Sequence, residues 1–220
     1  YLPALESEPA AVDKNRFISF RLPSEAVGPA AIRVRLVELQ NVQPPYAGGA
    51  APDFSAFQGQ VRWVGAPSQF VESSANPDAF WAATLQCDPY FDDWLGVSIL
   101  HATGVEIVPS STYEIQIISQ ACDREYEASF SSPLFISTSR WGDVVAPFNP
   151  PGPGTQPDFG DVSALVDKFR SAPGSISKVS GLLTGNIPEL SMDLSFSEIS
   201  ACVDAFRGLP YSMSGPGNCP

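Results

Sequence analysis

Residues 193–207 read Asp193-Leu194-Ser195-Phe196-Ser197-Glu198-Ile199-Ser200-Ala201-Cys202-Val203-Asp204-Ala205-Phe206-Arg207, and a second version of this stretch occupies residues 156–170. The two copies keep one offset throughout, and a Pro follows the final Arg of each. The matched pairs are Phe159 with Phe196, Asp161 with Glu198, Phe169 with Phe206, and Pro173 with Pro210. A duplicated stretch of this kind predicts a structural unit that occurs twice and organises the C-terminal third of the chain.

Each copy carries apolar residues at the spacing of one face of an amphipathic helix. They are Val162, Leu165, Val166 and Phe169 in the first copy, and Ile199, Cys202, Val203 and Phe206 in the second. Ser195 and Glu198 have the spacing of a helix capping box. Asp158 and Asp161 form a related pattern before the first helix. We therefore expect two short helices that bury these apolar faces against each other.

This arrangement resembles a type I dockerin, a module of paired calcium loops and helices. The resemblance rests on the duplicated helix with its Phe-x-Asp/Glu-Ile/Val start. It also rests on Trp141-Gly142-Asp143-Val144, which is similar to the Gly-Asp-Val that opens dockerin loops. It covers residues 141–211. The resemblance implies a small paired EF-hand-like fold, a secreted or surface protein of an environmental bacterium, and docking on a cohesin-like partner.

The resemblance also implies calcium, with Asp143, Asp158 and Asp161 as candidate ligands. Calcium takes six to eight oxygen ligands, which such a loop supplies from regularly spaced side chains. If Asp161 is the last ligand, the earlier positions fall on residues 150–155, where Pro and Gly predominate. The loop that ends at Glu198 is equally poor in oxygen ligands. Two interpretations stay open: helix capping, and a calcium site in the first loop.

The N-terminal two thirds alternate apolar and polar residues in short runs that Pro and Gly interrupt, which is typical of β-strands. The expected strands are residues 16–22, 31–36, 60–64, 69–72, 80–86, 96–101, 112–120, 126–130 and 134–138. We expect one antiparallel β-sandwich, so that the fold is mainly β with a small helical module after it. Pro109 and Tyr113 have the spacing of a tyrosine corner. With residues 132–138 as a last strand, the domain resembles a fibronectin type III or other immunoglobulin-like domain.

Trp63, Trp81 and Trp94 are expected in the core or at its edge, with a carbohydrate-stacking surface as the alternative. Residues 43–57 are too rich in Pro and Gly for regular structure and predict a long surface loop. Residues 1–14 predict an extended arm with nothing of its own to pack on. The chain therefore divides into an arm (1–14), a β-sandwich (15–140) and a dockerin-like module (141–220).

The chain carries 24 acidic and 12 basic residues, a net charge of −12. An acidic chain without a basic stripe argues against binding to nucleic acid and to anionic membranes. No apolar run is long enough to span a bilayer. A chain that begins Tyr1-Leu2-Pro3 without Met is expected to be a processed or trimmed product.

The four cysteines are Cys87, Cys122, Cys202 and Cys219. An even number in a chain of this composition favours disulfides and an oxidising compartment. Three pairings are open, and the most local joins Cys87 to Cys122 and Cys202 to Cys219. Without a Cys-x-x-Cys pair and with a single histidine, the chain is not expected to hold structural zinc.

No catalytic residues are predicted, and we expect a protein that is not an enzyme. His101 lies on an apolar expected strand, where a structural role is favoured over a place in a Ser-His-Asp triad. Asp92 and Asp93 are adjacent, so their side chains point apart and do not suit a glycosidase pair. The sequence also lacks the common nucleophile, metalloprotease and phosphate-loop motifs.

These features favour a structural or adhesive protein outside the cell, and in its most specific form a self-assembling fibre subunit. The arm, through Tyr1, Leu2 and Leu5, would add a strand to a neighbouring copy, and a head-to-tail contact of this kind propagates. The expected partners are further copies of the chain or other surface proteins. Two alternatives remain: a dockerin-type module that docks on a cohesin-like partner, and a carbohydrate-binding sandwich.

Overall fold

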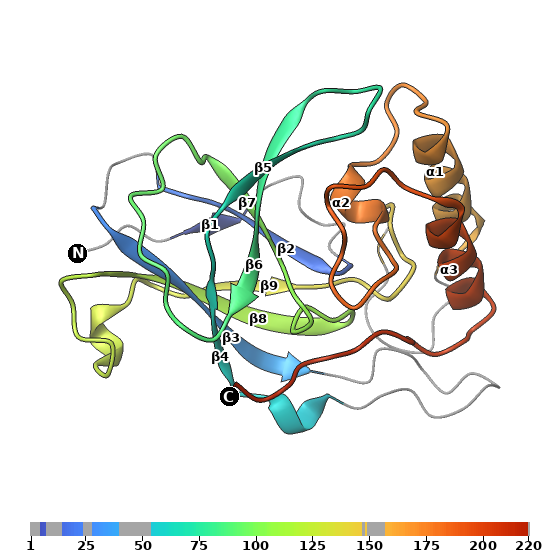
Figure 1. Cartoon of the computed structure of the whole chain (residues 1–220). Coiled ribbons are helices and arrows are strands. Elements are labelled where there is room, and N and C mark those ends of the chain that lie inside the picture. Colours follow the sequence, from blue (N-terminus) through green and yellow to red (C-terminus); the bar gives the residue numbers. More distant parts are fainter. Residues whose placement is uncertain are drawn as a thin grey trace.

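The computed structural model in Figure 1 describes residues 5–7, 15–23, 28–39, 54–146, 148 and 157–219. These residues are mainly β, with the α-helices gathered at one end of the sheet (Figure 1). The strands are β1 (Glu6–Ser7), β2 (Phe17–Arg21), β3 (Ala30–Leu39), β4 (Val61–Val64), β5 (Ser68–Val71), β6 (Ala79–Gln86), β7 (Ile99–Thr103), β8 (Ser111–Ser119) and β9 (Leu134–Ser137).

The strands form one sheet in the order β1-β2-β7-β6-β4-β3-β8-β9, and β5 pairs with β6. Strands β6 and β7 run parallel, and the other described pairs are antiparallel. The first strand of this order, β1, also contacts the last, β9. The sheet is therefore rolled into a nearly closed barrel.

Strand β3 lies within the barrel wall, between β4 and β8, and its residues are buried on both faces. Ile32, Val34 and Leu36 point into the barrel core and are fully buried. On the outer face, the Arg33 guanidinium lies 3.5 Å from the centre of the Phe130 ring and donates to Glu127 at 2.7 Å. Hydrogen bonds from Arg33, helped by the charge of Arg35, hold the pKa of the Glu127 carboxyl at about 2.

The strand predictions are confirmed for eight of the nine expected segments. The prediction for residues 126–130 is wrong, because Glu127–Ser129 form a short 3-10 helix (η2) that places the Glu127 carboxylate over Arg33. A second 3-10 turn, η1 (Ser55–Phe57), lies in the described end of the expected Pro/Gly loop, and residues 43–53 of that loop lie outside the described part.

The tyrosine corner is confirmed. The Tyr113 hydroxyl donates to the Glu106 carbonyl at 2.9 Å and accepts from the Val108 amide at 2.8 Å. The phenol is fully buried, and burial raises its pKa far above the usual range. Tyr113 therefore fixes the turn that leads into β8.

Both repeated helices form, as α1 (Phe159–Phe169) and α3 (Phe196–Phe206), with a short α2 (Lys178–Gly181) between them. Both predicted capping boxes are present: Asp158 with Asp161, and Ser195 with Glu198.

The predicted buried face of the helices is wrong in its last turn. Phe169 and Phe206 are each 48% exposed, whereas Lys168 and Ala205 point inward. The buried face is rotated by one residue because Asp161 and Glu198, at the start of each helix, also belong to it.

The helices share one apolar core with the barrel. Leu165 of α1 and Cys202 of α3 lie in the same buried cluster as Phe20 and Val34 of the sheet. Trp141, which is 2% exposed, belongs to the same cluster. The inner faces of α1 and α3 are therefore covered by the end of the barrel as well as by each other.

The disulfide pairing differs from the local pairing favoured by the sequence. Cys87 is bonded to Cys219, 132 residues away, with their Cα atoms 5.7 Å apart. The cause is the path of the tail after α3, which runs back along the barrel toward β4 (Figure 1). Arg62 of β4 donates to the Gly217 carbonyl and holds the tail there. Cys122 is an exposed free thiol and Cys202 a buried one.

The expectation that the N-terminal arm has nothing of its own to pack on is wrong for its described part. Leu5 is buried in the barrel core, and Glu6 and Ser7 pair with Arg21 and Phe20 of β2. Leu5 is therefore covered within its own chain. Tyr1 and Leu2 lie outside the described residues.

Within the described ranges, no helix has the length and apolar character needed to cross a membrane.

Removing the disulfide is expected to destabilise the fold strongly. In the chain-entropy model, a loop of 132 residues contributes about 5 kcal/mol. The double variant Cys87→Ser/Cys219→Ser should therefore lose about that much free energy of unfolding in urea melts. Cys122→Ser is the matched control and should unfold like the wild type. Equal stability of the double variant and wild type would contradict the assigned pairing.

Candidate functional site

Two adjacent residues just before β2, Asn15 and Arg16, reach from the barrel into the two loops of the helical repeat. The Asn15 amide nitrogen donates to the carbonyl of Arg140, and also lies 3.4 Å from the carbonyl of Asp143 and 3.3 Å from the Ser139 hydroxyl. Residues 139–143 lead into the first repeat. Asn15 is fully buried, so these bonds form away from water.

Arg16 does the same for the loop that precedes the second repeat. Its guanidinium donates to three backbone carbonyls: Leu183 at 3.3 Å, Thr184 at 3.0 Å and Asn186 at 2.8 Å. It also lies 5.5 Å from the centre of the Tyr211 ring. Arg16 is fully buried, and burial lowers its pKa from the usual value. The positively charged side chain of Arg16 thus binds three carbonyl oxygens of the second loop.

The carboxylate near the start of each helix binds the same loops from the other side. Asp161 accepts from the backbone amides of Val144 at 2.7 Å, Val145 at 3.0 Å and Asp158 at 2.8 Å. Burial raises the pKa of Asp161, and the three amides oppose that rise. Asp161 therefore fixes the first loop to α1.

Glu198 repeats this arrangement in the second copy. Its carboxylate accepts from the Ser195 amide at 2.8 Å and from the hydroxyl of Thr184. Thr184 belongs to the loop whose carbonyls Arg16 holds. Each loop is thus held between a donor from the barrel and a carboxylate from its own helix.

The candidate calcium ligands do not fit a calcium site in this arrangement. Both oxygens of Asp161 already accept backbone N–H groups, whereas calcium needs oxygens directed at it. Asp158 caps α1 by accepting from Gly160 at 2.6 Å. Asp143 is fully buried. In the described part of the chain, no group of three or more His, Cys, Asp and Glu side chains is placed to hold a metal ion. For Asp158 and Asp161 the capping interpretation is confirmed.

The negative charges of the three aspartates act on the buried thiol of Cys202. Burial raises the pKa of the Cys202 thiol, and the negative charges of Asp161, Asp143 and Asp158 raise it further. The thiol donates to the Gly142 carbonyl at 3.4 Å. Cys202 is therefore a protonated core residue.

A pocket of about 400 Å³ lies between the β5–β6 hairpin and the loop after α1. Its charged lining consists of Glu72 and Lys168, and most of the remaining lining is small or polar: Ser73, Ala75, Asn76, Ser171, Ala172, Pro173, Gly174, Ser175, Ile176 and Ser177. The pocket therefore offers hydroxyl and amide groups around one ion pair.

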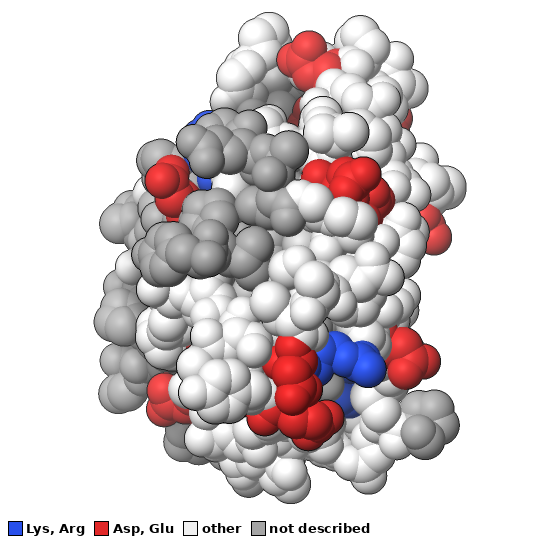
Figure 2. All heavy atoms as spheres, turned by 90° about the vertical axis from the view of Figure 1, so that its left-hand side faces the viewer, with Lys and Arg blue, Asp and Glu red and all other residues white. Residues whose placement is uncertain are grey.

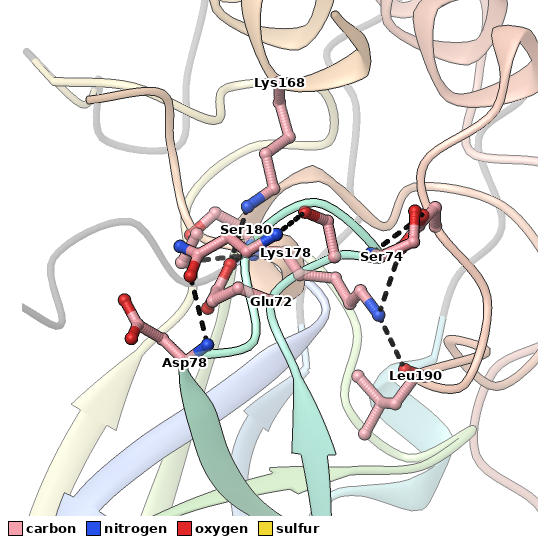
Figure 3. Close-up of polar contacts among 11 residues, drawn as sticks. Glu72, Ser74, Asp78, Lys168, Lys178, Ser180 and Leu190 are labelled. Carbon is pink, nitrogen blue, oxygen red and sulfur yellow. Dashed lines mark hydrogen bonds and ion pairs between the residues drawn. The ribbon is translucent and has the colours of Figure 1, made fainter. Parts of the chain in front are cut away.

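The residues around this pocket join the hairpin to the helices (Figure 3). One oxygen of Glu72 accepts from the Lys168 ammonium at 2.6 Å and from the Lys178 amide at 2.7 Å. The Lys178 ammonium, 1% exposed, donates to the Leu190 carbonyl at 3.1 Å and lies 3.7 Å from Asp193. Asp193 in turn accepts from the Ser74 hydroxyl at 2.5 Å.

His101 and the paired aspartates do not form a catalytic set. His101 shares a hydrogen bond with Ser19, but Ser19 is only 1% exposed and is closed to a substrate. The His101 ring makes edge contacts with Phe17 and Phe80. Asp92 accepts from the amide of Asp93, as expected of a loop.

The predicted tryptophans lie in the core or near it. Trp63 and Trp94 are 8% and 6% exposed, and Trp94 donates to the Ala30 carbonyl at 2.8 Å. Trp81 is half-buried on β6. Burial of Trp63 and Trp94 favours the core interpretation over a sugar-stacking surface.

The outer sides of α1 and α3 carry mostly the same residues, and Gly160 with Ser197 is an exposed pair that differs. Phe159 and Phe196 are 73% and 70% exposed, and Phe169 and Phe206 complete the aromatic set. The other matched outer residues are Ser163 with Ser200, Asp167 with Asp204, and Arg170 with Arg207. We call these ten residues the repeated outer face.

The inner sides of the two helices differ more. Leu165 corresponds to Cys202, and Lys168 to Ala205. Packing constrains inner residues, whereas surface substitutions usually change stability little. Identity on the outer side is therefore not explained by the needs of the fold.

Comparison with family models, curated proteins and solved structures finds no match for this chain. The assignment of a site therefore rests on the residues themselves.

Sequence reasoning found the repeat and its caps but missed Asn15, Arg16 and Glu72. Nothing in the sequence separates these polar residues from ordinary surface ones, because their burial depends on contacts with residues that are distant in the chain. The repeat of Phe, Ser, Asp and Arg on the outer side was visible, and exposure identifies it as a surface feature.

Replacement of Arg16 should release the second loop. Arg16→Leu removes the donor of three carbonyls, of which that of Leu183 belongs to a buried residue, and an unsatisfied buried group costs about 1–3 kcal/mol. We expect a loss of about 1–3 kcal/mol in urea unfolding, the same with calcium or a chelator, and partial recovery with millimolar methylguanidinium. Arg124→Leu, at an exposed position, is the control. An unfolding midpoint equal to that of the wild type would refute this role.

Substitutions of Glu72 and Lys168 should have strongly coupled effects on the free energy of unfolding. Glu72→Gln leaves the Lys168 ammonium buried without its carboxylate, which costs about 3–5 kcal/mol. In Glu72→Gln/Lys168→Met neither charge of this pair is left, so the double variant should be more stable than Glu72→Gln alone. Glu125→Gln, at an exposed position, is the control. Purely additive effects in urea melts would show that the pair does not hold the hairpin to the helices.

Proposed function

We propose that this protein is a non-enzymatic structural or adhesive protein of the cell exterior that acts by binding other proteins through the repeated outer face. The observation that carries the proposal is the exposure of Phe159, Phe196, Phe169 and Phe206 on two matched helices. Grouped exposed aromatic residues on a soluble domain typically mark a site of protein contact.

The surroundings of the face support a binding role. The two helices are fixed to the barrel by Arg16, Asn15 and the Glu72–Lys168 pair, so the face is presented on a rigid support. A rigid surface loses little conformational entropy when a partner binds. The Cys87–Cys219 bond fits an extracellular or surface location, because disulfides persist in oxidising compartments.

We propose two further resemblances: the helical part of the chain is dockerin-like, and the β part is immunoglobulin-like. The first is supported by two capped helices at matched positions, and the second by the Tyr113 corner. A cohesin-like partner is the second candidate, favoured because the repeated outer face lies on the two helices that carry the resemblance. Assembly into a fibre would require a further contact surface in addition to this face, because a self-complementary contact closes as a dimer.

Photo-cross-linking tests the proposal in the full-length chain. A photoreactive phenylalanine derivative in place of Phe196 should give adducts of higher mass with protein in the producing cells. The same derivative in place of Phe135, which is 56% exposed on β9, is the control and should give far fewer. If position 196 yields no more adducts than position 135, the face is not a protein-binding surface.

A further inference from the structure

The repeated outer face is balanced in charge although the chain is strongly acidic. Asp167 and Asp204 are matched by Arg170 and Arg207, and Arg207 lies 3.7 Å from Asp204. The whole chain carries −12. On the opposite side of the molecule, acidic side chains outnumber basic ones (Figure 2). Two copies that approach through such an acidic surface repel each other, whereas two copies of the outer face do not.

The two helices run in opposite directions. This follows from two observations: α1 and α3 pack against each other, and a Cβ atom built at Gly142 would lie 2.7 Å from Ala205 near the end of α3 and 3.1 Å from Pro157 just before α1. The start of α1 therefore lies beside the end of α3. Two matched, antiparallel helices present their outer residues with approximate two-fold symmetry.

A face with this symmetry suits a partner that carries the same face. In a two-fold homodimer, each residue that contacts a second residue is contacted by it in return, so the surface must complement itself. The outer face offers apolar rings, one acid and one base on each helix. Phenylalanines of one copy can cover those of another, while each Asp meets an Arg and not a second acid.

Resting on the proposed function, we infer that the partner of the repeated outer face is a second copy of this chain. The contact is a symmetric dimer in which α1 and α3 of one copy cover α1 and α3 of the other. It buries the four exposed phenylalanines, and the balance of Asp and Arg permits association despite the negative charge of the chain. Self-association then rests on the helices, and Leu5 of the N-terminal arm, which is buried, takes no part in it.

The first test measures mass by light scattering across a range of concentrations. The wild type should reach twice its formula mass. Phe159→Ser/Phe196→Ser should weaken self-association at least tenfold, whereas Phe135→Ser, on β9, should leave it unchanged. Circular dichroism of both variants reports whether they are folded. A folded double variant that dimerises like the wild type would overturn the inference.

The second test exchanges charges within the face. Asp167→Lys/Asp204→Lys makes the face wholly basic, and Arg170→Glu/Arg207→Glu makes it wholly acidic. Each variant alone should be monomeric because like charges meet. An equimolar mixture should form mixed dimers at low salt and lose them at high salt. A mixture that stays monomeric would contradict contact between two outer faces.

The outcome also separates this inference from the proposed function. If the wild type stays monomeric at every concentration while position 196 cross-links to a different protein, the second copy is the wrong partner and the binding role stands. If position 196 cross-links to no protein and the wild type is monomeric, both fail.

Discussion

The hydrogen bonds of Asn15 and Arg16 to the two loops of the helical repeat are the contacts on which the rest of the structure depends. The side chains of Asn15 and Arg16, just before β2, donate to backbone carbonyls in both loops. Without them, the carbonyls of the buried residues Arg140 and Leu183 would lose these donors, and folded proteins rarely leave buried carbonyls unpaired. The barrel therefore organises the loops, and the loops place α1 and α3.

This arrangement shows how side chains of the protein itself hold the described parts of both loops. In a calcium loop, the ion draws loop oxygens together. Here the Arg16 guanidinium holds the carbonyls of Leu183, Thr184 and Asn186, and Asp161 and Glu198 accept donors from the loops. Because the donors belong to the barrel, the helices and the barrel fold as one unit with one core. The outer face then becomes a fixed feature of the molecule.

The sequence predicted best what depends on neighbouring residues. Both capping boxes, both helices and the Tyr113 corner follow from short patterns, and each is present. The strand order and the rolling of the sheet could not be predicted, because they depend on pairings between distant segments such as β2 with β7. The Cys87–Cys219 bond depends in the same way on the path of the tail. The prediction that Phe169 is buried was wrong because Asp161, a charged residue, belongs to the buried face of its helix.

Hydrogen exchange of the Val144, Val145 and Ser195 amides, measured in the full-length protein with a calcium chelator present, distinguishes loops held by side chains from loops held by a metal ion. These amides donate to Asp161 and Glu198. If side chains alone organise the loops, the three amides should exchange as slowly as those of β3 and should not change when calcium is added. Fast exchange in the chelator that slows with calcium would show that a metal ion, and not Arg16 and the carboxylates, holds the loops together.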